Sequence, residues 1–261
     1  MKKERLDKIL SHHGFGSRKD CKSLIHSGRV FVNESVCTNC DFSVDCDVDV
    51  VRIDDEILQI REHVYIMMNK CQNVVSSTKD GLHKTVLDLL SPDYKINYLG
   101  GDLHPVGRLD VDTEGLLLLT TDGKLTHTLT SPKNHVVKTY YARLKNPVDI
   151  ETQKKYSDLF NSGLNVIAEG HEQSFVAKSA TLIWPNEKKC EYLTEFGDAS
   201  SEVLVSISEG KYHQVKRMFA TVGNEVVYLK RLSVGPLSLD AGLKPGEYRE
   251  LTADEIKLLL D

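Results

Sequence analysis

The chain has 261 residues, of which 40% are hydrophobic and 27% are charged, and its formal net charge at pH 7 is -5. This composition indicates a globular protein with one large or two smaller domains. It argues against a membrane protein, because no apolar run approaches the roughly 20 residues that a transmembrane helix requires. Residues 1–5 (Met-Lys-Lys-Glu-Arg) lack the apolar core of a signal peptide, so we expect a cytoplasmic protein with no membrane partner.

Basic residues are concentrated at the start of the chain. Residues 1–30 contain eight Lys or Arg and three acidic residues, whereas residues 31–58 contain one basic and eight acidic residues. A basic patch can bind phosphates whatever the total charge of the protein is. The acidic total is therefore compatible with a nucleic-acid partner.

Two short helices and several strands are predicted for the first 58 residues. Apolar residues at 6, 9 and 10 have helical spacing, and a second helix begins at Ser17, which can form a capping box with Asp20. The segments 30–32 and 47–50 are predicted to be strands, the second because its Asp and Val residues alternate.

Residues 4–58 resemble the S-four RNA-binding module of ribosomal and RNA-modifying proteins. The matching segments are Arg-Leu-Asp-Lys at 5–8, Gly-Ser-Arg-Lys at 16–19 and Gly-Arg-Val-Phe-Val-Asn at 28–33. The resemblance implies that basic side chains on or beside one helix face the RNA backbone. These side chains are Arg5, Arg18, Lys19, Lys22 and Arg29. The alternative is a charged helix that faces only solvent.

Six cysteines occur in the chain, at positions 21, 37, 40, 46, 71 and 190. Cys37 and Cys40 form a CxxC pair with Cys46 close by, but no second pair follows at zinc-finger spacing. In a cytosolic protein such cysteines are expected to be free thiols. We therefore expect no metal, with a zinc site as the alternative.

The polar residues 59–63 are expected to connect two domains, one at 1–60 and a larger one at 61–261. Apolar periodicity predicts both strands and helices in the larger domain. The strands are expected at 65–68, 116–119, 138–144, 180–184, 203–207 and 226–229, and the helices at 85–90, 124–129, 151–160, 215–222 and 252–260.

A polar loop precedes the apolar run at 116–119. It carries four ionisable residues, Arg108, Asp110, Asp112 and Glu114. A loop of this kind, fixed by a buried strand, can hold a carboxylate in a rigid position, and catalytic acids are often placed in this way. The alternative is a salt-bridged turn without catalytic function.

The helix expected at 215–222 has apolar residues at 215, 218, 219 and 222, which is the spacing of a buried face. Lys216 and Arg217 are interleaved with these residues. We expect both side chains to flank the core and to reach out of it.

The polar loop and this helix resemble the RsuA/RluB group of RNA pseudouridine synthases. The matches include Gly-Arg-Leu-Asp at 107–110, Asp-Thr-Glu-Gly-Leu at 112–116 and Gln-Val-Lys-Arg at 214–217. In that family the aspartate after Arg-Leu is the essential catalytic residue, a basic residue after Gln-Val pairs with it, and a tyrosine lies against the target base. These roles correspond to Asp110, Lys216 and Tyr140, with Arg108 and Arg217 as further RNA contacts.

The resemblance extends over nearly the whole chain and implies an α+β fold. A small S-four-like module would precede a catalytic domain with a mixed, mainly antiparallel sheet and flanking helices. The family breaks the glycosidic bond of a uridine, turns the base and rejoins it through carbon five, so no cofactor is needed. The target base must leave its stack to be reached. The sequence leaves open whether Asp110 attacks the sugar or removes a proton.

One residue departs from the family pattern. Cys71 stands where the family usually has proline after Asn-Lys. Proline fixes φ and cysteine does not, so this turn is expected to be less rigid than in the family.

Two segments, 208–220 and 239–249, are most similar to the branch of the family that acts on 16S rRNA. A site-specific enzyme must read local RNA shape, because phosphate contacts carry no sequence information. We therefore expect a monomer that modifies one uridine of 16S rRNA in a partly assembled small ribosomal subunit. The alternatives are the same reaction on 23S rRNA and a non-catalytic RNA-binding or ribosome assembly protein.

A magnesium-dependent phosphatase of the haloacid dehalogenase type is a further alternative, because it also uses an Asp-x-Asp pair. That pair should follow an apolar strand, whereas Asp110 and Asp112 precede one. The sequence therefore disfavours this alternative.

Overall fold

The computed structural model describes residues 3–58, 60, 63–95, 101–187, 192–194 and 197–260. The chain divides into two compact units, one of residues 1–65, 90–104 and 120–123, and one of residues 66–89, 105–119 and 124–261. The expected domain boundary between residues 60 and 61 adjoins residues 59, 61 and 62, which lie outside the described residues, as does Cys190. The boundary stays a prediction.

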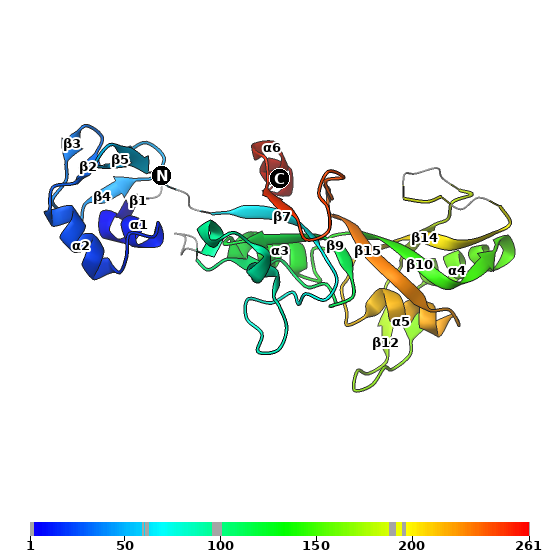
Figure 1. The fold of residues 1–261 in the computed structure, drawn as a ribbon. Helices are drawn as coiled ribbons and strands as arrows, with labels where there is room; N and C mark the ends of the chain where they lie inside the picture. The colour runs from blue at the N-terminus through cyan, green and yellow to red at the C-terminus, as the bar shows by residue number, and fades with distance from the viewer. Residues whose placement is uncertain are drawn as a thin grey trace. The chain divides into compact units, whose positions relative to one another are not determined.

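Short helices and strands form the N-terminal part of the first unit (Figure 1). The elements are β1 (Lys3–Arg5), α1 (Leu6–His12), α2 (Arg18–His26), β2 (Val30–Val32), β3 (Ser35–Val36), β4 (Ser43–Asp45), β5 (Val51–Ile53) and β6 (Glu56–Leu58). The strands form a sheet in the order β3-β2-β5-β6 and a separate β1-β4 pair. Leu6, Ile9 and Ile25 are fully buried in one apolar cluster with the strands. This burial is the main source of stability for so small a module.

The start of α2 confirms the predicted capping box. The backbone N–H of Ser17 donates to the Asp20 carboxylate at 2.9 Å, and the backbone N–H of Asp20 donates to the Ser17 hydroxyl at 3.3 Å. Two N–H groups that a helix leaves without partners are satisfied in this way.

The strand predicted at 47–50 is wrong, because β4 ends at Asp45 and β5 begins at Val51. Asp49 closes a turn between them: its carboxylate accepts from the Asp45 N–H at 2.8 Å, and its own N–H donates to the Asp45 carbonyl at 2.8 Å. Val48 is 71% exposed at this turn. Aspartate favours such local bonds over a strand ladder, which the alternation of Asp and Val did not reveal.

A nine-stranded sheet organises the rest of the chain, and it is mixed and mainly antiparallel, as expected. Its order is β13 (Thr181–Ile183), β14 (Ala199–Ile207), β10 (Lys138–Asp149), β15 (Val226–Val234), β9 (Glu114–Thr120), β7 (Tyr65–Lys70) and β17 (Tyr248–Glu250). Two short strands, β16 (Leu237–Ser238) and β8 (His104–Pro105), pair with β15 and β9. β9 and β15 are parallel, and their register places Gly115 opposite Arg231.

Outside the sheet, the described residues of this part also form four α-helices, two 3-10 turns and a small hairpin. They are α3 (Gly123–Thr130), α4 (Ile150–Ser162), α5 (Gln214–Thr221), α6 (Ala253–Leu260), η1 (Val86–Leu89), η2 (Pro92–Lys95) and the pair β11 (Leu164–Val166) with β12 (Phe175–Ala177). α4 packs on α5 through the rings of Phe160 and Phe219, whose centroids are 4.9 Å apart. None of the helices in the described part of the chain combines the length and apolar composition needed to cross a bilayer.

Candidate active site

A buried lysine binds the backbone of the polar loop at residues 107–113. Lys70 ends β7, and its ammonium donates to the carbonyls of Asp110 and Thr113 at 3.0 and 2.9 Å and to those of Cys71 and Val111 at 3.0 and 3.4 Å. Its side chain is fully buried. Burial disfavours the charged form and lowers the pKa of Lys70 to about 8, although nearby acidic groups oppose this effect. The backbone of the loop is therefore tied to the sheet by a charge-assisted network.

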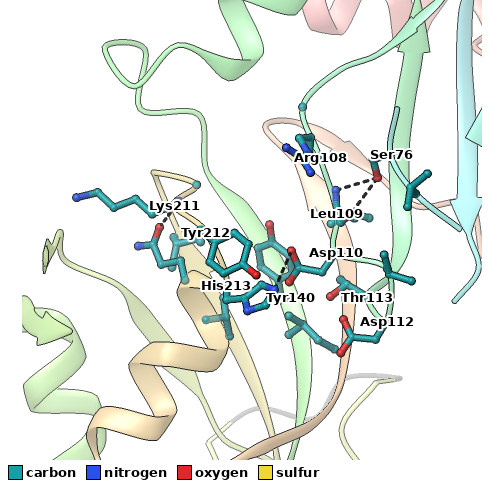
Figure 2. A pocket seen from close by; sticks show the side chains of 18 residues that line it. Ser76, Arg108, Leu109, Asp110, Asp112, Thr113, Tyr140, Lys211, Tyr212 and His213 are labelled. Atoms are coloured by element: carbon teal, nitrogen blue, oxygen red, sulfur yellow. Dashed lines mark hydrogen bonds and ion pairs between the residues drawn. The ribbon is translucent and has the colours of Figure 1, made fainter. Parts of the chain in front are cut away.

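A buried serine also binds the backbone of this loop. The Ser76 hydroxyl donates to the Leu109 carbonyl at 2.9 Å and accepts from the Leu109 N–H at 3.1 Å (Figure 2). The buried side chain of Ser76 thus satisfies both the backbone N–H and the carbonyl of Leu109, the residue before Asp110. These two hydrogen bonds fix the backbone from which the Asp110 side chain projects.

Asp110 and Asp112 share one ammonium group, that of Lys216 in α5. The Lys216 Nζ lies 3.4 Å from Asp110 Oδ2 and 2.6 Å from Asp112 Oδ1. Burial opposes ionisation of Asp112, but the hydrogen bond and the charge of Lys216 outweigh it and lower the pKa of that carboxyl. The contact between Lys216 and Asp110 agrees with the sequence-based expectation, whereas the closer contact with Asp112 was not anticipated.

The loop lines a cavity of about 740 Å³, which is within the range of small-molecule pockets. Asp110, Tyr140 and His213 all line this cavity (Figure 2). Tyr140 lies on β10 and is 7% exposed, while the side chain of Asp110 is 30% exposed. Arg108 also lines the cavity and is exposed. The cavity therefore combines an accessible carboxylate, an aromatic ring and a cation.

Arg217 does not reach out of the core, so this prediction is wrong. It is 3% exposed, and its guanidinium donates to the carbonyls of Ile167 and Gln173 at 2.8 and 2.7 Å. The β11–β12 hairpin, which lies far from α5 in the sequence, supplies Phe175, whose ring centroid is 4.8 Å from the guanidinium. Arg217 thus holds the hairpin against α5, and its position does not support an RNA contact.

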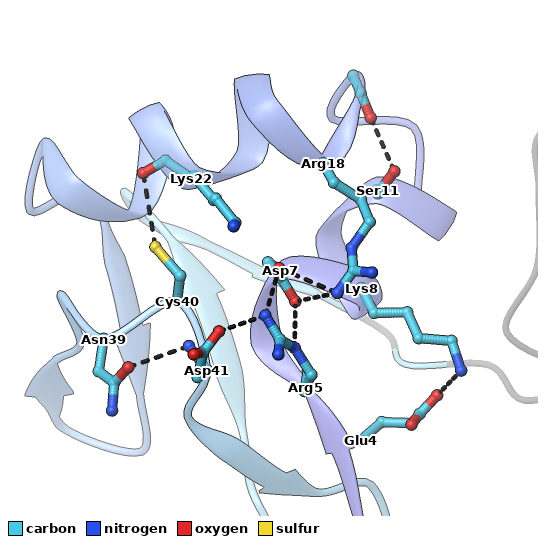
Figure 3. Close-up of polar contacts among 11 residues, drawn as sticks. Glu4, Arg5, Asp7, Lys8, Ser11, Arg18, Lys22, Asn39, Cys40 and Asp41 are labelled. Carbon is cyan, nitrogen blue, oxygen red and sulfur yellow. Dashed lines mark hydrogen bonds and ion pairs between the residues drawn. The ribbon is translucent and has the colours of Figure 1, made fainter.

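The basic residues of the N-terminal part are partly neutralised. Arg5 and Arg18 both bind the buried carboxylate of Asp7, with Arg18 at 3.0 Å (Figure 3). The bond from Arg5, followed by that from Arg18, lowers the pKa of Asp7 to about 2 in spite of its burial. Arg29 binds Asp54 at 3.0 Å. Lys19 and Lys22 are exposed and form no ion pair with any described residue.

Cys21, Cys37 and Cys40 are buried free thiols. Cys40 Sγ lies 3.3 Å from the His26 Nε2. Across the described ranges, no three His, Cys, Asp or Glu side chains form a group that could hold a metal ion.

Replacing Lys70 with Met keeps most of the side-chain volume and removes the ammonium from four carbonyls. We expect the free energy of unfolding to fall by about 2–5 kcal/mol, because buried polar groups lose their partner. Urea denaturation followed by circular dichroism measures this loss. Lys138→Met is the matched control: Lys138 donates to a single carbonyl, that of Val136, so its loss should cost about 1 kcal/mol or less. Equal losses of unfolding free energy in both variants would contradict a special stabilising role for the four carbonyl contacts of Lys70.

Comparison with known proteins identifies the family. A model of the RNA pseudouridylate synthase family matches residues 64–221, and an S4 domain model matches residues 4–45. An uncharacterized RNA pseudouridine synthase of Bacillus subtilis is 44% identical over 255 residues and covers 98% of each chain. A ribosomal small subunit pseudouridine synthase A of Escherichia coli is 38% identical over 252 residues, which is 97% of this chain and 98% of the relative.

A solved structure agrees with these matches. The crystal structure of a pseudouridylate synthase is 36% identical, covers 98% of this chain and 99% of its own, and superposes with a TM-score of 0.60. The similarity to that protein covers both the S4 domain and the nine-stranded sheet described above. The chain therefore belongs to the RNA pseudouridine synthases, enzymes that isomerise uridine in RNA to pseudouridine.

Proposed function

We propose that this enzyme converts one uridine of 16S rRNA to pseudouridine in a partly assembled small ribosomal subunit, with Asp110 as the catalytic residue. The observation that carries the proposal is the cavity that Asp110 and Tyr140 line together, in which the half-buried Asp110 is paired with Lys216. Relatives named ribosomal small subunit pseudouridine synthase A, such as those of Vibrio cholerae and Escherichia coli at 40% and 38% identity, support the choice of 16S over 23S rRNA.

The mechanism follows from the properties of the cavity. A uridine in a helix cannot enter it, so the base has to flip out of its stack, and the ring of Tyr140 can lie against it. The ammonium of Lys216 lies 3.4 Å from Asp110 Oδ2 and offsets the charge of this carboxylate beside the nucleoside. Asp110 acts on the nucleoside while the glycosidic bond breaks, and the base then rejoins the sugar through carbon five. Exposed Arg108 contacts a phosphate near the target.

Residues 1–60 form the RNA-binding domain in this proposal, and residues 61–261 form the catalytic domain. Asp7 orients Arg5 and Arg18 from inside the module, while Lys19 and Lys22 on α2 are exposed. Arg29 also lies at the surface of this module, paired with Asp54. The RNA backbone would contact these basic side chains as one surface. Each phosphate contact adds to the affinity because counterions are released.

The double substitution Lys19→Glu and Lys22→Glu should weaken binding of 16S rRNA about tenfold or more at low salt and make its salt dependence shallower, because two phosphate contacts are lost. Filter binding across a salt series measures both effects. The matched control is Lys154→Glu with Lys155→Glu, the same charge change at two exposed positions of α4. Equal weakening by the two pairs would show that net charge, rather than the face of α2, determines the affinity.

Tritium release from RNA labelled at carbon five of uridine tests the proposed substrate. We expect the purified enzyme to release one equivalent of tritium per 16S rRNA in a partly assembled small-subunit particle, and none from 23S rRNA. Release from 23S rRNA alone would reject the substrate and keep the chemistry. A protein that binds 16S rRNA and releases no tritium from either RNA would instead be a non-catalytic assembly factor.

A further inference from the structure

His213 lies between the polar loop at residues 107–113 and the β11–β12 hairpin, and its backbone conformation is unusual. It is the residue before α5 and adopts a left-handed conformation with φ 48° and ψ 29°. Such a conformation is uncommon for a residue other than glycine. Its ring stacks on that of Tyr212, with centroids 3.8 Å apart and planes inclined by 22°. The backbone conformation and the stacking on Tyr212 together restrict the orientation of the imidazole.

The two ring nitrogens of His213 face two different carboxylates. Nδ1 lies 3.0 Å from Glu169 Oε2, and Nε2 lies 3.9 Å from Asp110 Oδ1 (Figure 2 shows the contact with Asp110). Glu169 belongs to the loop between β11 and β12. Lys216 approaches the other oxygen of Asp110, Oδ2. The catalytic carboxylate is therefore held between two groups that both come from α5 or the residue before it.

Both ring nitrogens of His213 face carboxylate oxygens, which are acceptors. An imidazole that donates through Nδ1 to Glu169 has a lone pair on Nε2 unless it is protonated, and this lone pair would face a carboxylate oxygen. With a hydrogen on each nitrogen, the ring presents a donor toward both acids. Three carboxylates meet here, those of Asp110, Asp112 and Glu169, and Lys216 supplies one positive charge.

We propose that His213 is a positioning residue for Asp110, oriented in turn by Glu169. The Nε2 edge of His213 lies 3.9 Å from Oδ1 and the ammonium of Lys216 lies 3.4 Å from Oδ2, so that neighbours at both oxygens limit the orientations of the carboxylate toward the nucleoside. This inference rests on the catalytic role proposed for Asp110. The β11–β12 hairpin also has a role in this proposal. The contacts of Arg217 hold the hairpin in place, and the hairpin keeps Glu169 against His213.

Two substitutions separate the contacts of His213. The amide nitrogen of Asn occupies the position of Nδ1, so His213→Asn keeps the bond to Glu169 and loses the reach to Asp110, and Asn tolerates the left-handed backbone. The amide nitrogen of Gln occupies the position of Nε2, so His213→Gln keeps a donor toward Asp110. We expect kcat for pseudouridine formation to fall about 10–100-fold in His213→Asn with an unchanged KM, because the carboxylate loses its fixed orientation. We expect His213→Gln to recover most of this loss.

Glu169→Gln provides an independent variant that leaves His213 in place. We expect it to lower kcat, and to have no further effect when it is combined with His213→Asn, because both act through one contact chain. Thermal unfolding of each variant verifies the fold. A kcat within twofold of wild type in His213→Asn, a change confined to KM, or equal losses in the Asn and Gln variants would each overturn the positioning role. A wild-type enzyme that forms no pseudouridine would instead reject the proposed function, and this inference with it.

Discussion

Replacement of Asp110 by Asn should leave a folded protein that binds RNA and forms no pseudouridine. The substitution preserves size and polarity, and Lys216 keeps Asp112 as a partner at 2.6 Å, so the loop should retain its shape. The reacting carboxylate is lost, and contributions from such groups are typically 10²–10⁴-fold in rate. We expect less than about 1% of wild-type product in a tritium-release assay, with unchanged RNA affinity in filter binding.

Asp112→Asn is the control for this substitution. Its side chain is 69% exposed, and its removal leaves Lys216 free to bind Asp110 alone. We expect activity within about tenfold of wild type, because an exposed ion pair contributes little by itself. If Asp112→Asn abolished activity and Asp110→Asn did not, the catalytic carboxylate would be Asp112 and the assignment made here would be wrong.

Replacement of Gly115 by Ala should prevent the sheet from forming at the point where the polar loop at residues 107–113 enters it. A Cβ at Gly115 would lie 2.2 Å from the carbonyl oxygen and 2.6 Å from the nitrogen of Arg231, and the φ of this residue is +102°. Both obstacles are backbone atoms, which a side-chain rotation cannot move. The Arg231 guanidinium also donates to the Leu116 carbonyl at 2.7 Å, so any shift breaks a buried bond. We expect a loss of more than about 4 kcal/mol of stability.

Gly123→Ala is the matched control for this substitution. No heavy atom lies within 4 Å of a Cβ at Gly123, which begins α3. We expect this variant to fold with unchanged or slightly higher stability, because Ala is the better helix former. The two variants can be compared by soluble yield and by thermal unfolding. A Gly115→Ala protein that melted within a few degrees of wild type would contradict the close approach of β9 and β15.

Features that depend on near neighbours in the chain were predictable from the sequence. The capping boxes at Ser17 with Asp20 and at Thr252 with Glu255 are present, and the apolar run at 116–119 is the buried centre of β9. In each case the bonding partners lie within a few residues, or the apolar run itself requires burial. The antiparallel sheet followed from family resemblance instead, because strand order is not encoded in any one segment.

Features that depend on distant partners were not predictable. The burial of Arg217 requires the β11–β12 hairpin, which ends some forty residues before it, and helix periodicity alone cannot reveal such a cover. Lys70 was noted only as part of a family motif, because its carbonyl partners lie about forty residues further along the chain. His213 gave no signal, since its contacts with Asp110 and Glu169 arise from three separate segments.

Pseudouridine mapping in cells tests the central claim most directly, which is that Asp110 isomerises a uridine of 16S rRNA. Carbodiimide treatment and primer extension would be applied to rRNA from a strain that lacks the gene, and from the same strain supplied with the wild-type or the Asp110→Asn protein. We predict that one 16S pseudouridine disappears in the deletion strain, returns with the wild-type protein and does not return with Asp110→Asn. Unchanged 16S modification in the deletion strain, or its full return with Asp110→Asn, would contradict the account.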